Sequence, residues 1–177
     1  MIRLFTSSLA VLAMTSVFAA GTTQLKVRRA GAARVVVSVE TAENGPAAKA
    51  FNQSLRRNLG ISGYFQVGPN GQIKVTGTPG AGVTALGAGK QIRSSATFAD
   101  DKAARMAARE FVDAIVEAHT GKKGFARDRI AFVDRKGKDN AELYVCYPDG
   151  YDIRQLTADH RAAVGPRWTP NKQEIYY

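Results

Sequence analysis

The sequence predicts an α+β fold in which a small two-helix α/β sandwich domain is followed by a run of short, closely spaced strands. The first observation is that β-branched strand patterns alternate with two amphipathic helical patterns between residues 34 and 124. The second is that short apolar runs after residue 125 are separated by turn residues at small intervals, which is typical of all-β structure. We therefore expect two domains, 34–124 and 125–177, with the boundary near Lys122 to Phe125.

The first residues have the pattern of a secretory signal peptide. A positive charge at Arg3 precedes an apolar run from Leu4 to Phe18, and small residues follow from Ala19 to Gly21. Signal peptidase recognises this arrangement. We expect residues 1–19 to be removed near Ala19 and the protein to be exported, to the periplasm in a bacterium. A run of about 15 apolar residues is shorter than the roughly 20 that cross a bilayer, so no integral membrane span is expected.

Residues 20–33 are predicted to form a mobile N-terminal arm. Gln24, Leu25, Lys26 and Val27 alternate polar and apolar side chains, but the small residues that follow would make a poor core. Alternation is the pattern of a strand. The segment could therefore pair with a partner protein.

The first strand and helix are predicted between residues 34 and 60. Arg34 to Val39 is rich in β-branched residues, and Pro46 suits the first position of a helix. We expect this helix to end at Gly60. Its apolar face is expected to comprise Ala47, Ala48, Phe51, Leu55 and Leu59, and its polar face Asn52, Gln53, Arg56 and Arg57.

The middle of the domain is predicted to contain a hairpin and a further strand. Two short strands, 64–67 and 72–77, flank the turn pair Asn70-Gly71, and an Asn-Gly pair favours a tight hairpin turn. Residues 77–90 contain five glycines, and we expect a loop or an irregular edge there. A strand is predicted over 91–98, with Ile92, Ser94, Ala96 and Phe98 on one face.

A long second helix is predicted to begin at Asp100-Asp101 and to end at Thr120-Gly121. Carboxylates are favoured at the positive end of a helix, which explains the acidic pair. The apolar stripe of this helix is predicted to comprise Ala104, Ala107, Ala108, Phe111, Ala114, Ile115 and Ala118.

The last third is predicted to contain short strands joined by turns. Strand patterns occur at 130–133, 142–146 and 154–157, and Pro148-Asp149-Gly150 forms one of the turns between them. Two further strand ends, at 166–168 and 174–177, flank a turn at 169–172.

Composition limits the classes of partner. The net charge of +10, from 25 basic and 15 acidic residues, favours anionic partners. The basic residues are dispersed and are not interleaved with aromatic ones, so a nucleic-acid partner is not expected. The single cysteine, Cys146, excludes an intramolecular disulfide and is interpreted as a buried apolar residue, with an intermolecular pair as the alternative.

The sequence offers little for catalysis. His119 and His160 have neither metal-ligand nor triad spacing, and His119 is expected to be solvated at a helix end. Gly87 to Lys90 resembles the end of a phosphate-binding loop, but Thr84 stands where the earlier glycine is required and Gln91 replaces the magnesium-binding hydroxyl. We therefore expect no enzyme activity, no catalytic or metal-binding residues and no cofactor.

The last third resembles one WD40-like repeat of the TolB-type β-propeller. That repeat contains an Asp-Gly turn, a short strand ending in Leu-Thr, and a Pro-x-Trp-Ser-Pro-Asp-Gly segment. The matching residues here are Asp149, Gly150, Leu156, Thr157, Pro166, Trp168, Thr169 and Pro170. Thr169 keeps the hydroxyl of the serine, whereas Asn171-Lys172 replaces Asp-Gly and weakens the turn match. In this repeat Leu156 would fill the space between blades, with Trp168 packed over it.

Upstream features extend the resemblance to the amino-terminal domain of the TolB family. The first helix runs into Ser62-Gly63-Tyr64-Phe65, the second ends in the segment from Thr120 to Gly124, and 129–133 matches the entry into the first blade. The resemblance is strongest from Thr120 to Trp168 and weakest over 77–90. It implies a two-helix domain followed by an incomplete propeller of about one blade.

The resemblance also implies a function. TolB proteins are non-catalytic periplasmic components of the Tol-Pal system, which acts in envelope integrity, cell division and protein import. They bind Pal through the propeller and TolA through the amino-terminal segment. TolA-like and Pal-like proteins are therefore the implied partners, and Gln24, Leu25, Lys26 and Val27 match the TolA-binding segment by position. The alternative for this segment is a disordered tail.

The resemblance departs from the family in its length. A propeller needs at least four blades, whereas the sequence reaches Tyr177 within roughly the first. The Pal-binding face is therefore expected to be missing, and Trp168, Ile175 and Tyr176 are expected to lie exposed near open strand edges, which favour pairing with another chain. The alternatives are a fragment of an exported propeller-containing hydrolase, or a truncated fragment with no function of its own.

Overall fold

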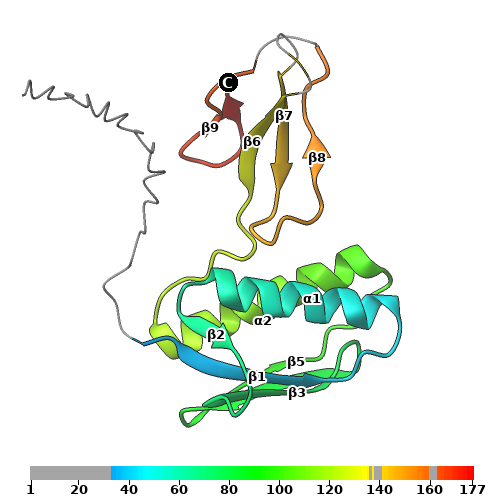
Figure 1. Ribbon diagram of the computed structural model, residues 1–177, viewed down its shortest axis with the longest axis vertical. Helices are drawn as coiled ribbons and strands as arrows, with labels where there is room; N and C mark the ends of the chain where they lie inside the picture. Colours follow the sequence, from blue (N-terminus) through cyan, green and yellow to red (C-terminus); the bar gives the residue numbers. More distant parts are fainter. Residues whose placement is uncertain (1–32, 136, 138–140, 160–162) are drawn as a thin grey trace, which may run out of the picture. The chain divides into compact units, whose positions relative to one another are not determined.

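Two helices and ten short strands form a mixed α+β structure in the part of the chain that the computed structural model describes, residues 33–135, 137, 141–159 and 163–177 (Figure 1). The mixed α+β class agrees with the prediction, whereas the incomplete propeller of about one blade stays a prediction. The two helices cover one face of a sheet, as the sequence predicts. Residues 1–32, which comprise the predicted signal peptide and most of the predicted arm, lie outside the described residues.

The main sheet has five strands in the order β2-β1-β3-β4-β5. Both neighbours of β1 run parallel to it, whereas β3, β4 and β5 are successively antiparallel. The strands are β1 (Val35–Thr41), β2 (Phe65–Val67), β3 (Ile73–Thr78), β4 (Gly82–Gly87) and β5 (Lys90–Ser94).

The two helices, α1 (Pro46–Ile61) and α2 (Asp101–Thr120), lie side by side on one face of this sheet (Figure 1). The predicted ends of α2 are confirmed. The Asp100 side chain accepts a hydrogen bond from the Ala103 amide, and Gly121 ends the helix in the left-handed conformation. The apolar stripes of both helices meet the sheet in one core. Its largest buried members include Phe51, Leu55, Leu59, Phe65, Ile73, Phe111 and Ile115.

Two details of α1 differ from prediction. The helix continues through Gly60 to Ile61, with Ser62 as its cap, because Gly60 keeps helical backbone geometry and does not act as the cap. Asn52, predicted on the polar face, is buried instead. Its amide donates to the Ala42 carbonyl and accepts from the Thr41 hydroxyl, so it fixes the loop after β1.

The predicted hairpin around Asn70-Gly71 is wrong. β2 and β3 both pair with β1, on opposite sides and in the same direction, so the segment between them crosses β1. Gly71 makes the crossing possible, since a Cβ there would lie 2.2 Å from the Ser38 amide nitrogen. The turn residues are thus used for a close crossing of a strand and not for a reversal.

The prediction of a loop or an irregular edge over residues 77–90 is also wrong. It forms the β3–β4 hairpin and the whole of β4, with Val83 and Ala85 buried in the core. The predicted strand over 91–98 is shorter than expected, because β5 ends at Ser94. Phe98 leaves the sheet, and its ring stacks on that of Phe51 with centroids 5.8 Å apart.

The strands after residue 125 form a three-stranded antiparallel sheet and a two-stranded ribbon (Figure 1). The sheet has the order β6-β7-β8, and the ribbon pairs β9 with β10. The main core reaches only Ala126, and a smaller buried set includes Leu143 and Val145. The strands are β6 (Ile130–Arg135), β7 (Ala141–Cys146), β8 (Arg154–Gln155), β9 (Arg167–Trp168) and β10 (Ile175–Tyr176).

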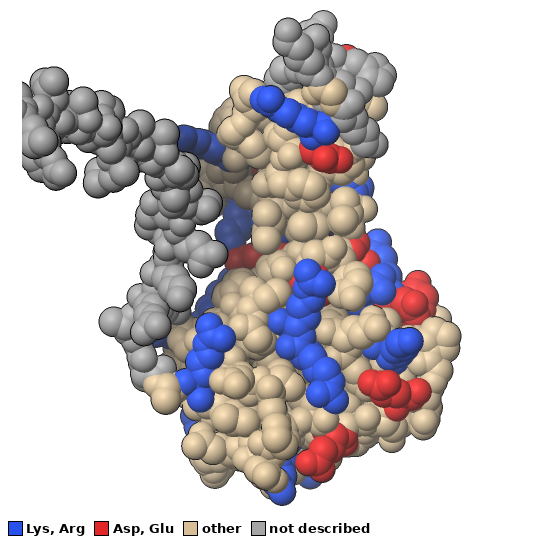
Figure 2. Space-filling model, viewed as in Figure 1, with Lys and Arg blue, Asp and Glu red and all other residues tan. Residues whose placement is uncertain are grey.

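Charges on the surface are mixed. Figure 2 shows Lys and Arg spread over the face in view and interspersed with Asp and Glu, as the dispersed basic residues of the sequence predict. Within the described residues, neither helix is long and apolar enough to cross a membrane.

Candidate functional site

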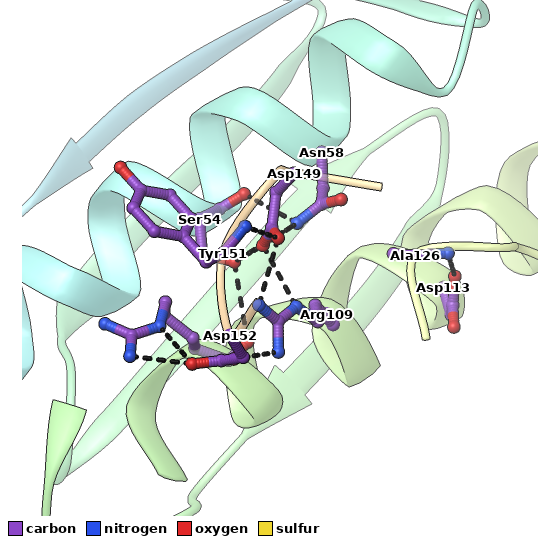
Figure 3. A network of polar contacts seen from close by, with 9 residues as sticks. Ser54, Asn58, Arg109, Asp113, Ala126, Asp149, Tyr151 and Asp152 are labelled. Carbon is purple, nitrogen blue, oxygen red and sulfur yellow. Dashed lines mark hydrogen bonds and ion pairs between the residues drawn. The ribbon is translucent and has the colours of Figure 1, made fainter. Parts of the chain in front are cut away.

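The candidate site contains polar side chains from both helices. Ser54 and Asn58 lie one turn apart on α1 (Figure 3). Arg105 and Arg109 lie one turn apart on α2. Residues four apart share a face of a helix. Ser54, Asn58 and Arg109 are almost completely buried, so they need partners within the protein.

Their partners come from the tight loop after β7. The Gly150 amide donates to the Tyr147 carbonyl at 2.8 Å, and the Tyr151 amide donates to the Asp149 carboxylate at 3.2 Å. Gly150 has a φ of 76°, as the predicted Asp-Gly turn requires. The loop therefore presents Asp149 and Asp152 together toward the helices (Figure 3).

Arg109 binds both carboxylates. Its Nε and Nη2 donate to the two oxygens of Asp149 at 2.9 and 3.0 Å, and its Nη1 donates to Asp152 at 2.8 Å. The Arg109 and Asp149 side chains are 0% exposed. Arg105 donates to the other oxygen of Asp152 at 2.8 Å. We call these four residues, Arg105, Arg109, Asp149 and Asp152, the arginine clamp.

The remaining lone pairs of Asp149 are also used. The Ser54 hydroxyl donates at 2.6 Å and the Asn58 amide at 3.0 Å, both to Oδ2. The Arg109 guanidinium lies 3.9 Å from the centroid of the Tyr147 ring, which adds a cation–π contact. A buried ion pair is stable only when its hydrogen-bonding groups are satisfied in this way.

The carboxylates of the clamp are held in their ionised form. Burial by itself would raise the pKa of Asp149, but the hydrogen bonds from Arg109 and Ser54 outweigh it, and the net pKa is lowered. Burial likewise opposes ionisation of Asp152, and hydrogen bonds from Arg105 and Arg109 lower its pKa overall. Each charge of the clamp is thus paired with an opposite charge inside the protein. The clamp therefore connects the loop after β7 to the helices.

A second connection fixes the segment between α2 and β6. Asp113 on α2 accepts the Ala126 amide at 2.8 Å and Arg127 Nε at 3.0 Å. Asp113 and Ala126 are both buried. The start of the β6 segment is therefore tied to the same helix that holds the loop after β7.

No protein-family model matches the chain. The structure is similar to the crystal structure of TolB from Acinetobacter baumannii, with a TM-score of 0.65 at 18% sequence identity. The match covers 81% of this chain and 43% of the TolB chain, so the chain spans less than half of that protein's length. The fold is TolB-like. At this identity the likeness concerns the fold alone.

The structure places the predicted motif residues of this TolB-like fold in two groups. Gly150 forms the expected turn, whereas Asp149, predicted only as a turn residue, is the buried anion of the clamp. Thr157 sits beside β7, where its hydroxyl donates to Glu142 and accepts the Leu143 amide. Leu156 follows β8, and its amide donates to the Leu143 carbonyl at 2.7 Å. The other motif residues lie in or next to the β9–β10 ribbon: Pro166, Trp168, Thr169 and Pro170.

The ribbon turn forms although its sequence departs from the motif. Thr169 is buried, and its carbonyl accepts the Lys172 amide at 2.8 Å. Lys172 takes the left-handed conformation that glycine would adopt, with a φ of 57°, and Asn171 accepts the Gln173 amide. Pro166 is half-buried and Pro170 is exposed beside this turn.

Leu156 and Trp168 are brought together as lining residues of one hollow of about 300 Å³, which Ile175 and Tyr177 also line. Trp168 and Ile175 are half-buried, and Tyr176 is 69% exposed. The predicted exposure is therefore confirmed for Tyr176, whereas Trp168 and Ile175 are less exposed than predicted. The predicted partner-binding residues Gln24, Leu25, Lys26 and Val27 lie outside the described residues.

Two predictions about reactive side chains are refined. His119 is half-buried, not solvated, and its ring meets Phe65 edge-on at 6.3 Å. Burial and then the nearby Lys90 lower its pKa. Cys146 is half-buried and unpaired. In the described residues, no group of three or more His, Cys, Asp or Glu side chains could hold a metal ion.

Sequence reasoning missed the clamp. Arg109 interrupts the apolar stripe of α2 between Ala108 and Phe111, and Ser54 interrupts that of α1. An arginine at a position where the helical period requires a buried residue is a detectable signal. Its partner, 40 residues away, gives no local signal.

Proposed function

We propose that the chain is a non-catalytic, TolB-like protein-binding component of the bacterial envelope, exported to the periplasm and acting without a cofactor. The observation that carries this proposal is the TolB-like fold, matched over 81% of the chain. The secretory pattern of residues 1–19 supports the location, and the TolB-type motif after residue 148 supports the family resemblance.

The strands β6 to β10 are, in this proposal, the first blade of a TolB-type propeller. The position of the Asp-Gly turn, the Leu-Thr pair beside β7 and the turn at Thr169 support this interpretation. The clamp holds the proposed blade in place, because it fixes the loop after β7 to α1 and α2 through buried, charge-assisted hydrogen bonds.

The partner-binding segment is the arm. In the TolB family the amino-terminal segment binds TolA, and Gln24 to Val27 occupies that place here. An alternating segment can add a strand to the edge of a partner's sheet, with backbone hydrogen bonds giving affinity and alternate side chains giving selectivity. Leu25 and Val27 would face one side of such a strand, and Gln24 and Lys26 the other.

The experiment is a calorimetric titration of the chain with the periplasmic domain of a TolA-like protein. Removal of Gln24 to Arg29 should abolish binding and leave the thermal midpoint unchanged. The pair Leu25→Asp and Val27→Asp should weaken binding, whereas the matched pair Gln24→Ser and Lys26→Ser should retain most of it. Undiminished affinity after removal of the arm would refute this assignment.

A Pal-like protein is the second partner that the resemblance implies. Pal binds the propeller in the TolB family, and the chain spans 43% of the length of the matched TolB. A parallel titration with a Pal-like domain therefore tests whether β6 to β10 suffice for that contact. Because the Pal-binding face is expected to be missing, this second titration should show no binding, and saturable binding would overturn that expectation.

A further inference from the structure

Three adjoining hollows form a groove around Arg129, at the start of the β6 segment. Their volumes are about 310, 300 and 480 Å³, and Arg129 lines all three. The first and second also share Arg154, and the second and third share Trp168 and Lys172. We call these hollows together the Arg129 groove.

The groove carries an excess of positive charge. Its basic lining residues are Lys102, Arg127, Arg129, Arg154 and Lys172, and its acidic ones are Asp128 and Asp152. Both carboxylates are already bound, Asp152 by the arginine clamp and Asp128 by Lys172 at 3.1 Å.

Arg129, Arg154 and Lys102 are the available cations of the groove. None of the three forms an ion pair with another residue in the part of the chain that the structure describes. All three are exposed. Their charges are therefore not neutralised within the described structure and can attract an anionic ligand from solution.

Apolar side chains line the groove together with these cations. Ile153 is 60% exposed, and the Trp168 ring lines two of the three hollows. Leu156, Ile175 and Tyr177 continue the apolar wall in the second hollow. A ligand that fills the groove must therefore present both negative charges and apolar groups.

We propose that the Arg129 groove binds an acidic, extended peptide segment of a partner protein. Carboxylates match the fork of an arginine, which can donate two parallel hydrogen bonds. In an extended peptide, alternate side chains point to opposite sides, so acidic and apolar residues can meet different walls. β8 also pairs only with β7 in the described sheet, so its outer edge is available for backbone hydrogen bonds.

Other occupants fit the groove less well. A phosphate polymer would place charge against the apolar wall, and a flat anionic membrane surface does not enter a concave groove. The arm of the chain carries Lys26, Arg28 and Arg29, and repulsion between like charges disfavours it.

Trp168 provides a direct reporter, because it is the only tryptophan in the sequence and lines the groove. We suggest titrating the chain with a short peptide of alternating Glu and Leu and following tryptophan emission. A matched peptide with Gln in place of Glu serves as the uncharged control. The acidic peptide should shift the emission saturably, with an affinity that falls as salt is raised, and the Gln peptide should not.

The decisive variant pair is Arg129→Gln with Arg154→Gln. Lys74→Gln with Arg93→Gln is the matched control, because both residues are exposed on strands of the main sheet and the change in net charge is the same. The groove variant should raise Kd for the acidic peptide about tenfold or more, and the control variant should not.

Three outcomes would overturn the proposal: unchanged binding in the groove variant, equal weakening in both variants, or stronger groove-dependent binding to polyphosphate or phosphatidylglycerol vesicles than to the peptide. The chain lacking Gln24 to Arg29 should bind the acidic peptide as the full chain does. Failure of the arm proposal is thus distinguishable from failure of this one.

Discussion

Arg109 on α2 and Asp149 in the loop after β7 face each other through two parallel hydrogen bonds of 2.9 and 3.0 Å, in a position closed to solvent. The two residues lie 40 positions apart in the sequence. Their pairing ties the strand segment that carries the TolB-type motif to both helices, since Asp149 also accepts from Ser54 on α1.

Replacement of Arg109 is expected to be strongly destabilising. Arg109→Met leaves Asp149 buried without its cation, and breaking a buried pair in this way costs about 3–5 kcal/mol. Arg105→Met is the matched control on the same helix, because Asp152 keeps Arg109 as a partner, and its expected cost is about 1 kcal/mol. Urea unfolding followed by circular dichroism measures both. Equal losses would show that the Arg109–Asp149 pair has no special role.

The clamp also predicts a dependence of stability on pH. The pKa values of Asp149 and Asp152 are lowered in the folded state, so the unfolded chain binds their protons first as the pH falls. Their stabilising contribution is complete above the unfolded pKa of about 3.9 and is lost as the pH falls through the folded values. The free energy of unfolding should therefore drop below about pH 4. In the Asp149→Asn variant, the free energy of unfolding should fall less steeply below this pH. An unfolding profile against pH identical to that of the parent would contradict this account.

Replacement of glycine by alanine is expected to have opposite effects on stability at Gly71 and at Gly60. Gly71→Ala places a methyl group against the backbone of β1 at the crossing, and should cost on the order of 2 kcal/mol or more. Gly60→Ala lies in α1 with open space around its Cβ position, and should stabilise the chain by about 0.5–1 kcal/mol. Thermal unfolding of the two variants tests the pair. A neutral Gly71→Ala variant would mean that the chain does not cross β1 as described.

Asp113 is expected to control access to the segment between α2 and β6. Asp113→Ala leaves the buried Ala126 amide without its acceptor, which costs about 1–3 kcal/mol. Limited trypsin digestion should then cut faster after Lys122 and Lys123. Glu117→Ala, an exposed position on the same helix, is the control and should not change the rate. Equal digestion of the Asp113 variant and the parent would rule out this role.

Local signals explain what could be predicted from the sequence. The ends of α2 follow from Asp100 and Gly121, whose preferences act within one turn of the helix. The Asn70-Gly71 pair shows the limit of the same reasoning. It correctly marks an unusual backbone, but the choice between a hairpin and a crossing depends on where β1 lies, and this is not a local property.

Long-range contacts explain what could not be predicted. Arg109 stands out in an apolar stripe, yet nothing near it names Asp149 as its partner. The Arg129 groove is hidden for a related reason. Lys102, Arg129, Arg154 and Lys172 are scattered over 70 positions and look like a dispersed solvated charge until the fold brings them to adjoining hollows.

We propose above that this TolB-like chain acts by binding other proteins, with its arm as the contact for a TolA-like partner. Hydrogen–deuterium exchange of the chain with and without the TolA-like periplasmic domain tests this claim most directly. We predict slower exchange in peptides containing Gln24 to Val27 and unchanged exchange in the buried helix α1. Slower exchange confined to other segments, with the arm unaffected at saturating partner, would contradict the account.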